Sequence, residues 1–189
     1  RATQDVDCII EISSYIKLEV LEEELRELKF GHDTSEGAPI CRWIYGGIKV
    51  DIMPTHSDVM GFSNRWYPDG IRSKIEAKLT DGTNIYILSP EYYLATKFEA
   101  HQDGGGDDLR TSHDFEDIIY VLDNNDSATD IVKGCDNIDL KQYLKEQCAI
   151  LINNGNIIES IDCMLPIESQ EERVLYIYEI LKNIASIEI

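Results

Sequence analysis

The sequence is poor in positive charge. It contains 17 Lys and Arg against 36 Asp and Glu, a formal net charge of −19 over 189 residues. Affinity for nucleic acid depends largely on neutralisation of phosphates by Lys and Arg, so this balance argues against a broad nucleic-acid-binding face. A local basic surface is still compatible with the basic residues in the middle of the chain: Arg42, Lys49, Arg65, Arg72, Lys74, Lys78, Lys97 and Arg110.

Long apolar runs and paired cysteines are also missing. No apolar run approaches the roughly 20 residues that a helix needs to cross a bilayer, and no secretory signal is visible. We therefore expect no membrane partner. The five cysteines are odd in number, scattered and never in a C-x-x-C pair, which argues against a zinc site and a disulfide framework. Free thiols are typical of the reducing cytoplasm, which is the predicted location.

The hydrophobic periodicity predicts a mixed α/β (α+β) protein with an α-helical C-terminal part. We expect a mostly buried strand over 5–12, a helix from Ser14 to about 29 with Gly31 just past its end, and a β-hairpin over 42–53. A Gly46-Gly47 turn joins the two strands of that hairpin. Residues 54–73 are expected to be irregular.

A second hairpin, with strands over 74–80 and 83–88, is expected to turn at Asp81-Gly82. We predict helices over about 89–101 and 112–122, joined by a flexible glycine-rich connector over 103–108. From 130 onward the chain is expected to be mainly helical, with a final helix over about 169–185. A soft boundary near Asn124-Asn125 divides the chain into a core domain over 1–124 and a helical region over 125–189.

The first predicted strand carries two carboxylates two residues apart. Side chains alternate along a strand, so Asp5 and Asp7 share one face. Two acidic groups side by side repel each other unless a cation sits between them, and a divalent metal that prefers oxygen ligands is the obvious candidate. Asp51, in the second strand of the predicted hairpin, is a candidate third ligand.

If the strand of Asp51 lies beside that of Asp5 and Asp7, three carboxylates converge on one sheet surface. Such a set suits a pair of Mg²⁺ ions that clamp a nucleoside triphosphate, activate an attacking hydroxyl and stabilise the pyrophosphate leaving group. The simpler alternative is that Asp5 and Asp7 are strand-edge carboxylates facing water.

Four segments carry a resemblance to a known family: Arg1-Ala-Thr-x-Asp-Val-Asp7, Lys49-Val-Asp-Ile-Met-Pro54, Ala95-Thr-Lys-Phe-Glu-Ala100 and Ser112-His-Asp-Phe-Glu-Asp-Ile-Ile119. With these four segments in this order, the chain resembles the polymerase-beta-type nucleotidyltransferase superfamily. More narrowly, it is similar to the minimal, toxin-like nucleotidyltransferases of the bacterial abortive-infection group. The resemblance implies a nucleotidyltransferase-like mixed sheet flanked by helices.

The resemblance also implies roles for individual residues. Asp5, Asp7 and Asp51 would be catalytic metal ligands, and Lys97 would contact the triphosphate. Asp114 and Asp117 would complete the site from the next helix, with Asp117 the better candidate because an acid at a helix start, such as Asp114, also stabilises the helix dipole.

Two further basic residues, Lys49 and Arg65, are candidate nucleotide-binding residues. Lys49 either pairs with the carboxylates on its own face of the strand or contacts substrate. The segment Arg65-Trp66-Tyr67 either stacks a base or forms a loop anchored by a buried Trp66.

The function implied is Mg²⁺-dependent transfer of a nucleoside monophosphate from a nucleoside triphosphate to an acceptor hydroxyl on a protein, a small molecule or tRNA. Toxin activity, with an antitoxin partner, follows from the family analogy alone. The superfamily places a Gly-Gly or Gly-Ser phosphate-binding turn about ten residues before its first aspartate, and the sequence begins too late to contain it. We therefore expect an N-terminally incomplete core. The alternative is an inactive nucleotidyltransferase-like module that binds nucleotide or a protein partner.

Overall fold

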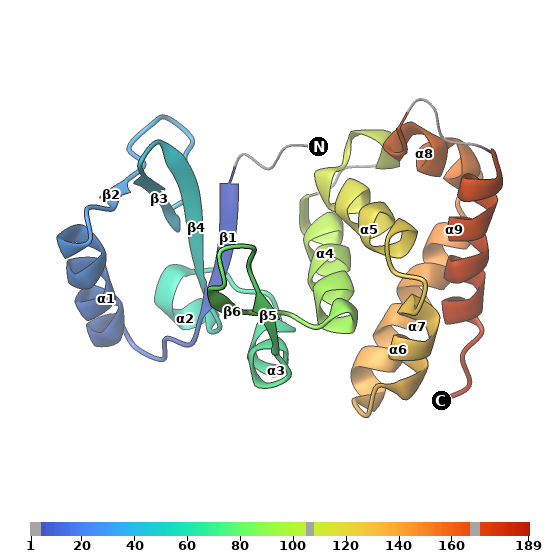
Figure 1. The fold of residues 1–189 in the computed structure, drawn as a ribbon, viewed down its shortest axis with the longest axis horizontal. Helices are drawn as coiled ribbons and strands as arrows, with labels where there is room; N and C mark the ends of the chain where they lie inside the picture. The colour runs from blue at the N-terminus through green and yellow to red at the C-terminus, as the bar shows by residue number, and fades with distance from the viewer. Residues whose placement is uncertain (1–4, 105–107, 167–170) are drawn as a thin grey trace. The chain divides into compact units, whose positions relative to one another are not determined.

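The computed structural model describes residues 5–104, 108–166 and 171–189. The chain is a mixed α/β protein, as predicted, and it divides into two compact units, Arg1–Arg72 and Ser73–Ile189 (Figure 1). The glycine-rich segment 103–108 lies partly outside the described residues. None of the helices in the described ranges is long and apolar enough to span a membrane.

The first unit is built on a four-stranded sheet in the order β1-β4-β3-β2. β1 (Asp5–Ile10) pairs in parallel with β4 (Ile48–Pro54), whereas β3 (Arg42–Tyr45) is antiparallel to both β4 and the short β2 (Gly31–His32). A parallel pair needs a long crossover connection, and α1 (Tyr15–Glu27) lies in that connection.

The β3–β4 turn fixes the register of the hairpin. Gly46 and Gly47 both have positive φ, 57° and 85°, which two-residue hairpin turns require and which only glycine adopts without strain. Tyr45 therefore lies opposite Ile48, and counting outward places Arg42 opposite Asp51. This hairpin was predicted, and the structure confirms it.

The prediction of a mostly buried first strand was wrong. β1 ends at Ile10, and Val6, Asp7 and Cys8 are exposed. The reason is its place at the end of the sheet, where β4 is its one neighbour among the described strands. An edge strand keeps more of its surface in water than a central strand does.

Helix α1 begins as its sequence predicts and packs on the sheet. The Ser14 hydroxyl accepts a hydrogen bond from the Lys17 backbone N–H at 3.4 Å, which caps the helix. Leu25 of α1 is buried against Trp43 and Ile52 of the sheet. The left-handed residue after the helix is Lys29 (φ 72°) rather than Gly31, which instead begins β2.

The stretch predicted to be irregular contains two short helices, α2 (Ser57–Met60) and α3 (Tyr67–Arg72). α3 includes Pro68, in the first turn where proline is tolerated, and Gly70, which disfavours helix on propensity alone. Packing outweighs that preference, because Gly70 and the preceding Trp66 are buried. The burial of Trp66 also supports the interpretation of this loop as one anchored by its tryptophan.

The second unit opens with a two-stranded antiparallel sheet, β5 (Ile75–Lys78) and β6 (Asn84–Ile87), as predicted. Helices follow, and their bounds are α4 (Pro90–Gly104), the 3₁₀ helix η1 (Leu109–Thr111), α5 (His113–Asp123), α6 (Ala128–Gly134), α7 (Ile138–Ile152), α8 (Ile157–Met164) and α9 (Glu171–Ala185).

The helices of the second unit share one core. α4 packs on α5 and α7, and α9 packs on α5 and α7, so α4 and α5 belong with the later helices (Figure 1). The division therefore falls between 72 and 73 rather than at the predicted 124/125. The largest fully buried side chains of this core are Leu94, Phe98, Phe115, Ile118, Ile119, Leu122, Leu140, Leu144, Ile161, Ile177 and Leu181.

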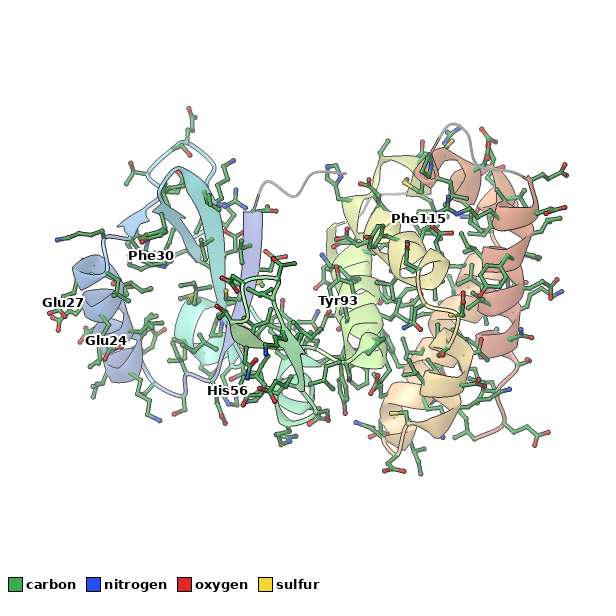
Figure 2. All side chains as sticks on the ribbon, viewed as in Figure 1. Glu24, Glu27, Phe30, His56, Tyr93 and Phe115 are labelled. Carbon is green, nitrogen blue, oxygen red and sulfur yellow. The ribbon has the colours of Figure 1, made fainter. Side chains whose placement is uncertain are left out.

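Truncation of Phe115, labelled on α5 in Figure 2, is expected to destabilise this core. Its side chain is fully buried, so Phe115→Ala should lower the free energy of unfolding by about 3–5 kcal/mol in urea denaturation followed by circular dichroism. Tyr120→Ala is the control on the same helix. Tyr120 is 65% exposed, and its truncation should cost less than about 0.5 kcal/mol. Equal effects would contradict the packing of α5.

Candidate functional site

The sheet of the first unit brings the three predicted carboxylates to one face. Asp7 of β1 lies directly opposite Asp51 of β4, and Asp5 lies opposite Lys49. Residues two apart on a strand share a face, so Asp5, Asp7 and Asp51 all lie on the same side of the sheet. The expectation that the strand of Asp51 adjoins that of Asp5 and Asp7 is confirmed.

The cation beside these carboxylates is the guanidinium of Arg42. It binds Asp51 through two hydrogen bonds, Nε to Oδ1 at 2.8 Å and Nη2 to Oδ2 at 2.6 Å. Nη2 also lies 3.8 Å from Asp5 Oδ2. A fork-to-fork pair of this kind is among the stronger charged contacts in proteins. The bonds to Asp51 raise the pKa of Arg42 above its ordinary value, so this cation is permanent.

Sequence reasoning missed Arg42, although a signal for it was present. Arg42 was noted only as one of the basic residues in the middle of the chain. Counting residue pairs outward from the Gly46-Gly47 turn places Arg42 opposite Asp51 and on the same face. The hairpin register was therefore sufficient to predict the ion pair.

The three carboxylates fit Mg²⁺ by chemistry and by register, because hard divalent cations take carboxylate oxygens. In the arrangement described, however, both oxygens of Asp51 are bound to Arg42. Accordingly, no group of three or more ligating side chains in residues 5–104, 108–166 and 171–189 is arranged to hold a metal ion as it stands. For an ion to contact Asp5, Asp7 and Asp51 together, Arg42 would have to release Asp51 or share its oxygens with the ion, because each carboxylate oxygen has two lone pairs.

The other predicted basic residues of the first unit differ in their surroundings. Lys49 shares the face of Asp51 and is exposed, and its charge helps to lower the pKa of Asp33. That pKa is lowered mainly by hydrogen bonds from Ser35. Arg65 is exposed in the turn before α3, with its guanidinium carbon 4.8 Å from the centroid of the Trp66 ring.

A second charged cluster lies in the helical unit. Lys97 of α4 places its Nζ 2.7 Å from Asp117 and 3.5 Å from Asp114, both on α5. The predicted shared face of these two acids is confirmed, and Asp117 makes the closer contact. Burial lowers the pKa of Lys97, but the hydrogen bond that its ammonium donates to Asp117, together with the nearby Tyr93 and Asp114, outweighs burial and raises the pKa overall.

The start of α5 positions this cluster. The Ser112 hydroxyl caps the helix by accepting the Phe115 backbone N–H at 3.2 Å, and it also lies 2.8 Å from Nδ1 of His101. His101 follows Lys97 by four residues, so the two share a face of α4. Burial lowers the pKa of His101, and the charge of Asp114 opposes this only in part.

The predicted site residues thus form two clusters, each within its own unit. Asp5, Asp7 and Asp51 lie together in the first unit, which also contains Lys49 and Arg65. Lys97 and Asp117 lie together in the second.

Comparison of the chain with models of protein families finds no match, and comparisons with curated protein sequences and with solved structures find none either. The functional interpretation therefore rests on the residues and geometry of the two clusters.

Removal of the guanidinium is expected to destabilise the first unit. In Arg42→Gln, Asp51 stays largely buried opposite Asp7 without its bidentate partner, so the free energy of unfolding should fall by about 1–3 kcal/mol. Urea denaturation measures the change. Arg72→Gln is the matched control, because Arg72 is 70% exposed and its pair with Asp69 lies at the surface. Equal stability of the two variants would show that Arg42 is dispensable as a counter-cation.

Acid should destabilise the second unit partly through His101. Its pKa is lower in the folded chain than the ordinary value near 6.5, so the unfolded chain binds a proton more readily. The stability that His101 contributes is present above about pH 6.5 and is lost as the pH falls below it.

The measurement is the change in melting temperature between about pH 7.5 and about pH 5.5. His101→Gln should show a smaller drop than the unsubstituted protein. His113→Gln, whose ring is 83% exposed, should keep the original drop. An unchanged drop in His101→Gln would contradict the role of buried His101.

Proposed function

We propose that the protein is a Mg²⁺-dependent nucleotidyltransferase that moves a nucleoside monophosphate from a nucleoside triphosphate to an acceptor hydroxyl. The observation that carries this proposal is the face of the first sheet, where Asp7 and Asp51 lie opposite each other and Asp5 lies on the same side. Carboxylates on adjacent strands are costly without a cation, and oxygen donors of this kind are suited to Mg²⁺.

In the proposed reaction the acceptor oxygen bonds to the α-phosphorus, the bond from that phosphorus to the β-phosphate oxygen breaks, and pyrophosphate leaves. The hydroxyl proton passes to water or to a carboxylate of the face. Mg²⁺, when bound, would neutralise triphosphate charge and favour ionisation of the acceptor hydroxyl. Asp5, Asp7 and Asp51 would hold it once Arg42 has released Asp51 or shares its oxygens.

Lys97 is the proposed contact to the triphosphate. Asp117 keeps its ammonium charged and fixed in position, at 2.7 Å. The contact of Lys97 with Asp114 is longer, at 3.5 Å. Replacing it by a contact with a phosphate oxygen therefore costs less interaction energy than replacing the contact with Asp117. Lys49 and Arg65, both exposed, are further proposed contacts to the nucleotide.

The acidity of the chain favours a protein or small-molecule acceptor over tRNA, since a net charge of −19 repels a polyanion. Toxin activity, neutralised by an antitoxin, stays part of the proposal through the family resemblance. The proposed location is the cytoplasm, which is supported by the five cysteines, all of them described and free.

A second candidate function has its own supporting observation. Arg42 donates a hydrogen bond to each oxygen of Asp51, so the charge of this buried carboxylate is compensated without a metal. This arrangement favours an inactive nucleotidyltransferase-like module that binds nucleotide or a protein partner.

The test is incubation of the full chain with Mg²⁺, a bacterial extract and each of the four labelled nucleoside triphosphates. The proposal predicts label on a protein or small molecule, and Asp5→Asn/Asp7→Asn should reduce it at least about a hundredfold. Glu23→Gln/Glu24→Gln, an equal change of charge on the exposed side of α1, should retain labelling.

Melting temperature separates the two candidates. A rise with Mg²⁺ and triphosphate, lost in Asp5→Asn/Asp7→Asn and without labelling, would support the binding module. Labelling as strong in the double variant as in the original chain would exclude Asp5 and Asp7 from the site.

A further inference from the structure

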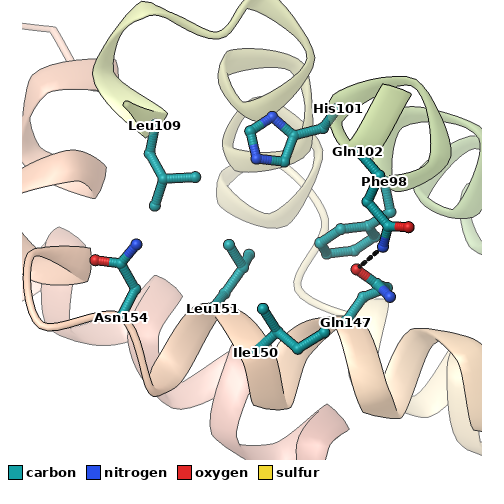
Figure 3. A pocket seen from close by; sticks show the side chains of 8 residues that line it. All are labelled: Phe98, His101, Gln102, Leu109, Gln147, Ile150, Leu151 and Asn154. Carbon is teal, nitrogen blue, oxygen red and sulfur yellow. Dashed lines mark hydrogen bonds between the residues drawn. The ribbon is translucent and has the colours of Figure 1, made fainter. Parts of the chain in front are cut away.

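The helical unit contains a pocket of about 490 Å³ between α4, η1 and α7, within the size range of small-molecule sites (Figure 3). Phe98, His101 and Gln102 of α4 form one side, and Leu109 of η1 forms another. Three residues of α7 and the second residue after its end complete the lining: Gln147, Ile150, Leu151 and Asn154.

Among the described residues that line the pocket there is no Asp, Glu, Lys or Arg, although 28% of the chain is charged. His101 is the titratable side chain in this described lining, and burial lowers its pKa, which favours the neutral ring near pH 7. An ionic ligand would find no opposite charge among these described lining residues to offset any hydration that it loses on binding. The pocket therefore selects against charge.

Two polar groups are turned into the pocket from opposite sides. Asn154 Oδ1 accepts the Asn156 backbone N–H at 2.9 Å, which fixes the carboxamide and directs its NH₂ toward the pocket (Figure 3). His101 is held through Nδ1 by Ser112, and its second ring nitrogen faces the same space. Within the described parts of the chain, neither the Asn154 NH₂ nor this nitrogen has a hydrogen-bond partner.

The remaining walls favour a largely apolar ligand. Phe98, Leu109, Ile150 and Leu151 supply apolar surface, and the side-chain amide of Gln102 donates to Gln147 and closes one end. A purely aliphatic ligand would leave the Asn154 and His101 groups unpaired, at a cost of one hydrogen bond each.

We propose that this pocket binds an uncharged heteroaromatic ring with hydrogen-bond donors and acceptors on its edge, the chemistry of a nucleobase. The ring packs between the aliphatic side chains and Phe98, and its edge accepts from Asn154 and pairs with His101. This site goes beyond the proposed transfer reaction, because its lining includes none of Asp5, Asp7, Asp51, Lys97 and Asp117.

The test is titration of the full chain with adenosine, guanosine, cytidine and uridine, followed by saturation-transfer NMR and calorimetry. At least one nucleoside should bind saturably, whereas myo-inositol, which is uncharged but not aromatic, should not. The matching nucleoside monophosphates distinguish the source of the base. Weaker binding of the monophosphate indicates a free base or nucleoside, and equal or tighter binding indicates the base of a nucleotide whose phosphate stays in water.

Two variants locate the binding. Ile150→Arg places a charge in the pocket and should weaken binding at least about tenfold. Its control is Ile138→Arg, because Ile138 lies on the same helix and is 64% exposed, close to the 61% of Ile150. Asn154→Asp keeps the acceptor for Asn156 but removes the donor, and should weaken binding about five- to tenfold. Asn156→Asp, the same change of charge outside the lining, should not.

Circular dichroism measures whether each variant is folded. If Ile150→Arg does not fold, the comparison of Asn154→Asp with Asn156→Asp tests the location of the binding site. The proposal is overturned if no nucleoside binds saturably, if myo-inositol binds equally well, or if Asn154→Asp binds as tightly as Asn156→Asp.

Discussion

Strand β4 is the element on which the first unit depends, because it pairs in parallel with β1 on one side and antiparallel with β3 on the other. Asp51 therefore lies opposite Asp7 in one pairing and opposite Arg42 in the other. The repulsion created by the first neighbour is offset by the ion pair made with the second. The strand pairing therefore also sets the charge balance. A shift of β1 or β3 along β4 would disturb both the pairing and the ion pair.

The helical unit meets a similar electrostatic problem with a different cation. Lys97 is a compact charge on a flexible stem and lies between two carboxylates, Asp114 and Asp117. Arg42 uses its planar fork to grip both oxygens of a single carboxylate. The chemistry of the two side chains accounts for the difference. It also separates their proposed roles, because Lys97 can exchange one partner and keep the other, whereas Arg42 must give up or share a bidentate pair.

Much of the fold follows from local patterns in the sequence. The Gly46-Gly47 hairpin, the helix start at Ser14 and the succession of late helices were all predicted, because turn and capping chemistry depend on a few adjacent residues. The exposure of β1 was not predicted, since an apolar run such as Val6 to Ile12 does not indicate whether its strand lies at the edge or the centre of a sheet. Helix α3 was missed for a related reason: it is short, Gly70 disfavours helix locally, and the burial of Trp66 is a tertiary effect.

The candidate site shows the same division. The carboxylates were recognised by type and spacing, but the cation between them required knowledge of which strand adjoins which. The α4–α7 pocket was not predicted at all, because Phe98, Leu109 and Asn154 come from separate segments and carry no shared sequence signal.

The two-glycine turn has a consequence for how this sequence can vary. Side chains alternate along a strand, so a gain or loss of one residue between Tyr45 and Ile48 that shifts the register by one moves Arg42 to the opposite face from Asp51, even if no charged residue changes. Substitutions on the surface of the hairpin leave the pairing intact, whereas a shift of this kind breaks it. In related chains, the length of this turn should therefore be preserved as strictly as the identities of the arginine and the aspartate that it aligns.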